Sequence, residues 1–299
     1  RLGIALVSLF GLLGAFLLGK ALSGRVGALA AMALVIVNPL YLAQSQTIQA
    51  EVSSAAFELL AIGLALYWWK YPTGRRGIVL AILTGVTVAL SILCKLLGVS
   101  LLVPIGLLMV ARLWIGVPSG DRDIHKGRPY AAALAGIAAF IITTAVLLLP
   151  FAGDFQAFVS SVITFHTGTS RQFIQSANSS LITSTLESLL TLAALYGSLA
   201  ALLRQDWRVL LLLAWFLASA FLLLRQVPLF PHHLVSLVPP LVALAAMGVA
   251  LPSPEKQPAS SSGARFDMAT LQSILAGVGV VLVLLTAVSS LSQDTIYYR

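Results

Sequence analysis

Apolar stretches of about 20 residues recur along the whole chain, from Leu2 to Leu291, and short polar turns separate them. Each stretch is long enough to cross a hydrocarbon core of about 30 Å as a helix. We therefore predict an all-α integral membrane protein with about ten transmembrane helices. The spans are placed at about 2–18, 26–43, 52–69, 78–94, 97–113, 130–150, 181–203, 208–224, 234–251 and 269–291.

Three segments depart from this alternation. Segments 114–129 and 252–268 are rich in Pro, Gly, Ser and charged residues, a composition with little capacity to pack, so each is predicted to be a linker. Segment 152–180 and the residue before it place aromatic residues at helical spacing, among them Phe151, Phe155 and Phe158. We expect one amphipathic helix lying at the membrane interface, followed by a polar loop.

Composition excludes a water-soluble globular protein. The chain is 59% hydrophobic and 9% charged, whereas soluble domains are about 25% charged. The net charge of +8 does not indicate a nucleic-acid partner, because the basic residues are scattered through the turns between predicted spans.

The basic residues instead predict an orientation in the membrane. One set of turns holds thirteen of the 18 Lys and Arg residues, namely Lys20, Arg25, Lys70, Arg75, Arg76, Arg112, Arg122, Lys126, Arg128, Arg204, Arg208, Lys256 and Arg265. The other side holds only Arg1, Lys95, Arg171, Arg225 and Arg299. By the positive-inside rule the first set and the 252–268 linker are cytoplasmic. The abundant Ala and Leu and the short turns favour a prokaryotic plasma membrane.

Two acidic residues are candidates for chemistry. Glu51 opens the third predicted span, and Glu58 follows seven residues later, on nearly the same helix face and about 10 Å deeper. An acidic face of this kind is typical of a cavity. The alternatives also stand, because a carboxylate is favoured in the first turn of a helix and Glu58 can be a buried, hydrogen-bonded carboxyl.

Basic candidates gather on the predicted outer side. Lys95 ends a span there, against the charge bias, and is expected either to snorkel to the interface or to contact an anionic lipid phosphate. Arg225, His232 and His233 cluster in RQVPLFPHH and indicate a polar substrate or phosphate site or, alternatively, interfacial packing. Adjacent histidines point in different directions on a regular element, so we do not expect these two alone to form a metal site.

The predicted outer loop supplies weaker candidates. His166 and Arg171 are expected either to close over a substrate or to belong to a solvated loop. Asn178 begins a match to the glycosylation acceptor pattern, a short pattern that arises often by chance.

Three longer stretches together resemble a known family. They are NPLYLAQSQTIQAEVSSAAFELLAIGLALYWW, GVTVALSILCKLLGVSLLVPIGLLMV and PLFPHHLVSLVPPLVALAA. The order resembles the membrane core of a GT-C superfamily glycosyltransferase, in the group of dolichyl-phosphate-mannose–protein mannosyltransferases and bacterial aminoarabinose transferases. The resemblance places the family's second acidic residue at Glu51 and its hairpin lysine at Lys95.

The chain departs from the family pattern in two places. The arginine that usually precedes the acidic residue falls at Gln46. The family's main catalytic aspartate lies in the first outer loop, and no acidic residue precedes Glu51 here. We therefore expect this chain to be a fragment that lacks an N-terminal span and the first outer loop.

The resemblance implies an inverting transfer of sugar from a polyprenyl-phosphate-linked donor to a protein, lipid or glycan acceptor at the outer membrane face. An acidic residue, Glu51, would act as general base. Lys95, Arg225, His232 and His233 would contact the donor phosphate or line the cavity. No motif indicates a cofactor. A divalent metal ion stays open, although no motif indicates one.

Other classes remain open from the sequence. A secondary transporter would show inverted repeats and broken spans at the bilayer midplane, and we find no repeat that relates the two halves. A surface-polysaccharide polymerase or ligase would share the lipid-linked donors.

Overall fold

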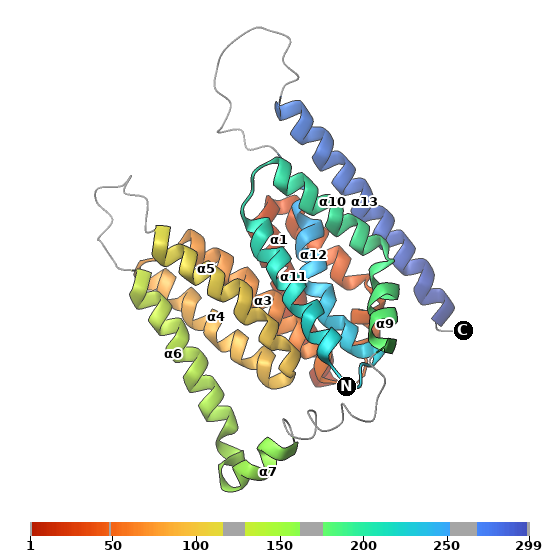
Figure 1. The fold of residues 1–299 in the computed structure, drawn as a ribbon. Coiled ribbons are helices and arrows are strands. Elements are labelled where there is room, and N and C mark those ends of the chain that lie inside the picture. The colour runs from red at the N-terminus through yellow and green to blue at the C-terminus, as the bar shows by residue number, and fades with distance from the viewer. Residues whose placement is uncertain (1, 48, 116–128, 162–175, 252–267, 298–299) are drawn as a thin grey trace.

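The computed structural model describes residues 2–47, 49–115, 129–161, 176–251 and 268–297 (Figure 1). Every regular element within these ranges is a helix, so the predicted all-α class is confirmed. The elements are α1 (Leu2–Ile36), α2 (Pro39–Ser45), α3 (Ala50–Lys70), α4 (Gly74–Cys94), η1 (Leu96–Leu101), α5 (Leu102–Ile115), α6 (Pro129–Leu148), η2 (Leu149–Asp154), α7 (Phe155–Val159), α9 (Ser176–Leu186), α10 (Leu189–Leu203), α11 (Arg208–Arg225), η5 (Pro231–Leu237), α12 (Val238–Met247) and α13 (Met268–Tyr297).

The first helix is a hairpin. Its course breaks at Ser23 (φ −139°, ψ 21°) and Gly24 (φ 69°, ψ −153°), a backbone conformation that glycine adopts readily. A Cβ built on Gly19 would collide with the carbonyl oxygen of Gly27. Gly19 and Gly27 are eight residues apart and would be separated by about 12 Å in one straight helix. Because they are in contact instead, the two halves of α1 fold back on each other.

Seven described helices are long and apolar enough to cross a membrane, or eight if the bent pair α9 and α10 forms one span. Seven is below the predicted ten for three reasons. The predicted span 181–203 falls on the bent pair α9 and α10, which is counted apart. The predicted span 2–18 and most of 26–43 lie in α1, which counts once by length although it folds back. The apolar helix Pro231–Met247 covers most of the predicted span 234–251 but is shorter than the others. The individual spans therefore stay a prediction.

Helix α3 is the most buried of these helices and lies at the centre of the bundle (Figure 1). The α1 hairpin packs along one side of it, and α4 packs along another side, with α6 beyond α4. These approaches are close because glycines face the contacts: a Cβ on Gly14 would overlap the backbone of Leu59 and Leu60 in α3. Small residues allow such approaches between helices in a membrane.

Contacts between distant segments define the end of the bundle opposite Glu51. The Trp69 ring at the end of α3 lies 4.7 Å from the Trp207 ring, centroid to centroid. Next to Trp207, the Arg208 guanidinium donates to the carbonyl oxygens of Ala21 (2.7 Å) and Leu22 (3.1 Å) at the α1 turn. The turns predicted to be cytoplasmic thus meet at one end. Which side of a membrane that end faces stays a prediction.

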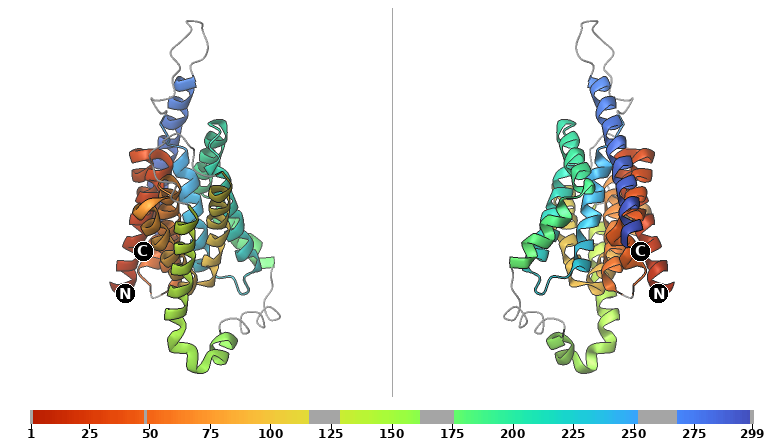
Figure 2. Two further views of the ribbon diagram at one scale, coloured as in Figure 1. Left: turned by 90° about the vertical axis from the view of Figure 1, so that its left-hand side faces the viewer. Right: turned by 90° about the vertical axis from the view of Figure 1, so that its right-hand side faces the viewer.

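The segment predicted as an outer amphipathic helix is described only in part. Its beginning forms η2 and the short α7, where the Phe151 and Phe158 rings lie 5.0 Å apart. This part extends beyond the bundle at the end where the N-terminus lies (Figure 2). Residues 162–175 and the linker 252–267 lie outside the described residues.

Candidate active site

Glu51 occupies the first turn of α3. Gln49, the residue before the helix, has an extended backbone (φ −131°, ψ 153°) and makes no side-chain cap, and the helix begins at Ala50. The Glu51 carboxylate is therefore close to the positive end of the helix dipole, which favours its charge. Only 7% of the residue is exposed, so its carboxylate needs a partner inside the bundle.

Lys95 supplies that partner. It follows the last residue of α4, where the backbone becomes extended (φ −153°, ψ 130°) before η1 begins. Its ammonium nitrogen lies 2.7 Å from Oε1 of Glu51. The Lys95 side chain is 27% exposed and that of Glu51 is 6% exposed. The ammonium thus faces both the buried carboxylate and the open side of the site, and it does not merely snorkel to an interface.

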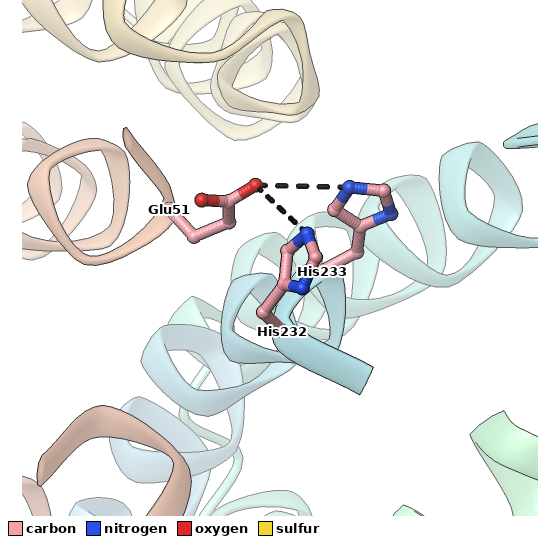
Figure 3. A group of neighbouring side chains, drawn as sticks. All are labelled: Glu51, His232 and His233. Carbon is pink, nitrogen blue, oxygen red and sulfur yellow. Dashed lines mark ion pairs between the residues drawn. The ribbon is translucent and has the colours of Figure 1, made fainter. Parts of the chain in front are cut away.

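Both histidines join this pair. The Nε2 atoms of His232 and His233 each lie 3.7 Å from the same Oε1 of Glu51 (Figure 3). The expectation that adjacent histidines point in different directions is wrong at this position. They lie near the start of the 3-10 helix η5, with ring centroids 4.5 Å apart and ring planes at 80°, so both rings reach the carboxylate. We call Glu51, Lys95, His232 and His233 the Glu51 cluster.

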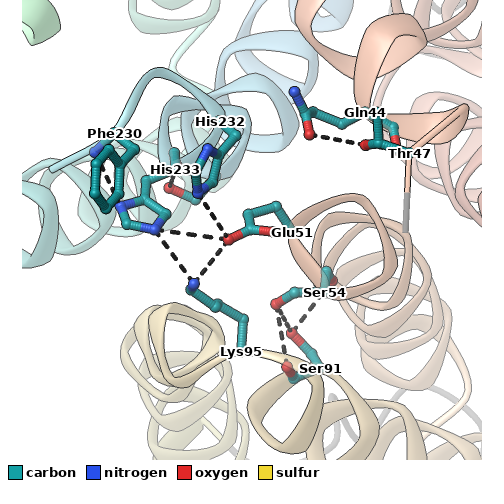
Figure 4. A network of polar contacts seen from close by, with 10 residues as sticks. Gln44, Thr47, Glu51, Ser54, Ser91, Lys95, Phe230, His232 and His233 are labelled. Carbon is teal, nitrogen blue, oxygen red and sulfur yellow. Dashed lines mark hydrogen bonds and ion pairs between the residues drawn. The ribbon is translucent and has the colours of Figure 1, made fainter. Parts of the chain in front are cut away.

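Both ring nitrogens of His233 have a partner in the cluster or beside it. The backbone N–H of Phe230 donates to Nδ1 at 3.3 Å, and the Lys95 ammonium lies 3.3 Å from Nε2 (Figure 4). An ammonium can only donate, and a neutral imidazole accepts at one nitrogen only. The two contacts are therefore alternatives that belong to different tautomers of the ring. The Phe230 ring stacks on His232 at 5.4 Å.

A pair of serines fixes α3 against α4 below the cluster. The Ser54 hydroxyl donates to the Ser91 carbonyl at 3.1 Å, and the two hydroxyl oxygens also lie 3.1 Å apart (Figure 4). Both side chains are buried. Ser54 lies one turn after Glu51 and Ser91 one turn before Lys95, so these bonds hold the Glu51–Lys95 pair in register. No pattern in the sequence marks either serine as part of the site.

Glu58 does not extend the cluster. Its side chain is fully buried, and its Oε1 lies 3.4 Å from the Ser54 hydroxyl oxygen, whose single proton is shared between this contact and the shorter one to the Ser91 carbonyl. Its Oε2 has no hydrogen-bond partner among the described residues. Of the two interpretations that the sequence left open, the structure favours a buried, hydrogen-bonded carboxyl.

The remaining sequence candidates lie elsewhere. Arg225 ends α11 with its guanidinium 5.5 Å from the Phe221 ring, and no hydrogen bond or ion pair joins it to the cluster within the described part of the chain. His166 and Arg171 lie outside the described residues. Asn178 is 4% exposed, and its amide donates to the Gln226 carbonyl at 2.7 Å. It ties α9 to the segment that leads to the histidines, and it is not presented for glycosylation.

Three members of the cluster have the donor types of a metal site. Glu51, His232 and His233 offer one ligand atom each, all within 4.8 Å of one another, and such donors suit zinc. The ammonium of Lys95 already lies 2.7 Å from the Glu51 oxygen. Because it supplies the positive charge that a metal ion would supply, the full set of four residues favours an ion-pair site.

One comparison with known proteins gives a match. The family model described as dolichyl-phosphate-mannose-protein mannosyltransferase matches residues 1–166, more than half of the 299 residues. The matched region includes Glu51 and Lys95 and ends before the histidine pair. It confirms the resemblance seen in the sequence. No curated protein and no solved structure matches the chain.

Proposed function

Because this chain belongs to the dolichyl-phosphate-mannose-protein mannosyltransferase family, we propose that it transfers mannose from a polyprenyl-phosphate-mannose donor to an acceptor hydroxyl, with the Glu51 cluster as the reaction site. The family is one of membrane glycosyltransferases that use such donors. The observation that carries the proposal is the 2.7 Å contact between Lys95 and Glu51, with both histidines beside it. A base and several donors to an anion meet there.

The carboxylate of Glu51 activates the acceptor hydroxyl. The oxygen of the acceptor hydroxyl attacks the anomeric carbon of the sugar while the bond from that carbon to the phosphate oxygen breaks. The hydroxyl proton passes to the carboxylate, which acts as general base. One displacement inverts the configuration at the anomeric carbon, and the products are the mannosylated acceptor and polyprenyl phosphate.

Lys95 and the histidines stabilise the leaving phosphate. Negative charge grows on the phosphate as the bond to the sugar breaks, and fixed donors stabilise that charge. The Lys95 ammonium is partly exposed, and Nε2 of His233 lies 3.3 Å from its nitrogen. A phosphate that approaches from the exposed side can accept from the Lys95 ammonium, and also from the His233 ring in the tautomer that carries a proton on Nε2. A charge-assisted hydrogen bond of this kind is stronger than a neutral one.

The reaction site belongs to one end of the bundle. Glu51 lies in the first turn of α3, whereas the turns rich in Lys and Arg meet at the other end of that helix. If basic turns face the cytoplasm, the cluster lies at the outer face, where a lipid-linked donor and a protein acceptor can meet.

The decisive experiment compares matched carboxylate variants. Membranes containing the full-length protein are supplied with polyprenyl-phosphate mannose and a serine- and threonine-containing acceptor peptide. Glu51→Gln is expected to lower kcat by about a hundredfold or more, the lower range of a general-base contribution. Glu187→Gln, which removes an exposed carboxylate outside the cluster, should leave the rate unchanged. Equal rates for the two variants would overturn the assignment of Glu51.

A further inference from the structure

A cavity of about 130 Å³ lies between α3, α4, α5 and α6, far from the Glu51 cluster. Its lining includes Ala65 and Trp68 from α3, Met109 from α5 and Phe140 from α6. Ala65 follows Glu51 by about 21 Å along α3, so the cavity belongs to the opposite part of the bundle. It has no place in the proposed transfer reaction.

The cavity offers an apolar surface that is open at one side. Its one hydroxyl-bearing lining residue, Thr84, donates to the Leu80 carbonyl at 2.8 Å and so needs no further partner. Nε1 of Trp68, another lining residue, is buried and has no hydrogen-bond partner among the described residues. A buried water needs two to four polar partners, so one isolated donor does not hold a water, and the cavity accepts hydrocarbon. Two lining residues, Leu102 and Ile137, are 45% and 44% exposed. The cavity therefore opens between α5 and α6, on the surface that faces lipid in a membrane.

A buried arginine continues the same face of α5. Leu108 and Met109 line the cavity, and Arg112 follows them at the i+4 and i+3 positions, toward the Trp69 end of the bundle. Only 7% of Arg112 is exposed, and its guanidinium carbon lies 5.1 Å from the Trp69 ring centroid.

Within the part of the chain that the structure describes, Arg112 lacks a counter-charge. Its Nε has no hydrogen-bond partner there, and no ion pair joins the guanidinium to a described carboxylate. A buried charge is costly unless it is paired. The contact with one aromatic face offsets only part of that cost.

We propose that an anionic phospholipid, from the leaflet at the Arg112 end, binds here with an acyl chain in the cavity and its phosphate on Arg112. Basic pockets between membrane helices bind anionic head groups in this way. The guanidinium supplies N–H donors in one plane, and phosphate oxygens accept hydrogen bonds from them. A polyprenyl-phosphate donor fits less well, because its phosphate is assigned to the Glu51 end, about 27 Å away along α3.

The test measures lipid retention and does not depend on activity. The purified full-length protein is incubated with equal amounts of phosphatidylglycerol and phosphatidylcholine of identical acyl chains, and bound lipids are counted by native mass spectrometry. The wild type is expected to retain phosphatidylglycerol preferentially. Arg112→Gln should weaken that retention by about tenfold or more, the loss expected for hydrogen bonds to a charged group. Arg75→Gln, which removes an exposed cation from the start of α4, is the matched control and should retain the lipid.

A second variant tests the cavity itself. Ala133 is 5% exposed and lines the cavity, so Ala133→Leu should fill it and also reduce phosphatidylglycerol retention. If Arg112→Gln shows no cooperative melting transition and so does not fold, Ala133→Leu by itself tests whether the lipid binds in the cavity. The proposal is overturned if the two lipids are retained equally, or if a folded Arg112→Gln or Ala133→Leu variant behaves as the wild type. It is also overturned if polyprenyl phosphate displaces phosphatidylglycerol in an Arg112-dependent manner, since the site would then hold a donor-type lipid.

Discussion

The Lys95 ammonium lies 2.7 Å from the Glu51 carboxylate and joins the beginning of α3 to the end of α4. The contact is buried on the carboxylate side and open on the ammonium side. The buried Ser54 and Ser91 side chains support it one turn away on each helix. The same contact thus holds two helices together and keeps a partly exposed cation beside the Glu51 carboxylate.

The first prediction concerns this pair as a unit. Lys95→Met leaves the Glu51 carboxylate buried without its strongest partner. We expect a loss of roughly 3 kcal/mol in unfolding free energy, the lower end for a broken buried pair, because the ammonium is partly exposed. The double variant Glu51→Gln with Lys95→Met should be more stable than Lys95→Met alone. A double-mutant cycle of unfolding in mixed micelles measures the coupling. Additive effects would show that the contact contributes nothing.

The second prediction concerns metal binding. Removal of the Lys95 ammonium leaves Glu51, His232 and His233 facing one another with a net negative charge and three zinc-type donors. Zinc should therefore raise the melting temperature of Lys95→Met by several degrees, through binding to the folded state. Lys95→Arg keeps a cation in place and should show no such increase. A zinc effect of equal size in the wild type would mean that the ammonium does not exclude the ion.

The third prediction separates Glu58 from the reaction. An amide oxygen can accept from Ser54 as the carboxyl does, so Glu58→Gln should change the unfolding free energy by less than about 1 kcal/mol. It should also leave the transfer rate unchanged. Glu58→Ala removes a fully buried side chain and should cost about 2 kcal/mol or more through the cavity it leaves. Thermal melting and the peptide assay distinguish the two variants. Loss of transfer in Glu58→Gln would give this carboxyl a role in the chemistry.

The fourth prediction concerns helix packing. A Cβ on Gly14 would overlap the backbone of Leu59 and Leu60, so Gly14→Ala must push the α1 hairpin away from α3. We expect a loss of about 1–3 kcal/mol, as for other overpacked sites. Gly106 has nothing within 4 Å of a Cβ, and Gly106→Ala should be neutral or should stabilise by up to about 1 kcal/mol through helix propensity. Melting temperatures in one detergent give the comparison. If both alanines behave alike, Gly14 does not set the spacing of the helices.

The sequence by itself determined the class of this protein, an all-α integral membrane protein. A stretch of apolar residues long enough to cross the bilayer must form a helix there, because lipid offers no partner for the backbone. That requirement is local, so it can be recognised without knowing what the helix contacts. The break between the predicted spans 2–18 and 26–43 can be recognised from the sequence too, because Ser23 and Gly24 interrupt an apolar stretch there.

The tertiary structure alone decided which side chains meet. The sequence singled out Glu51, Lys95, Arg225, His232 and His233 together, but only the first two and the histidines converge. Arg225 faces Phe221 instead. Whether two polar residues touch depends on the rotation and depth of each helix, and these follow from contacts between segments far apart in the chain. The Lys95–Glu51 contact joins residues 44 apart. It depends on how α3 and α4 pack, so no short sequence motif indicates it.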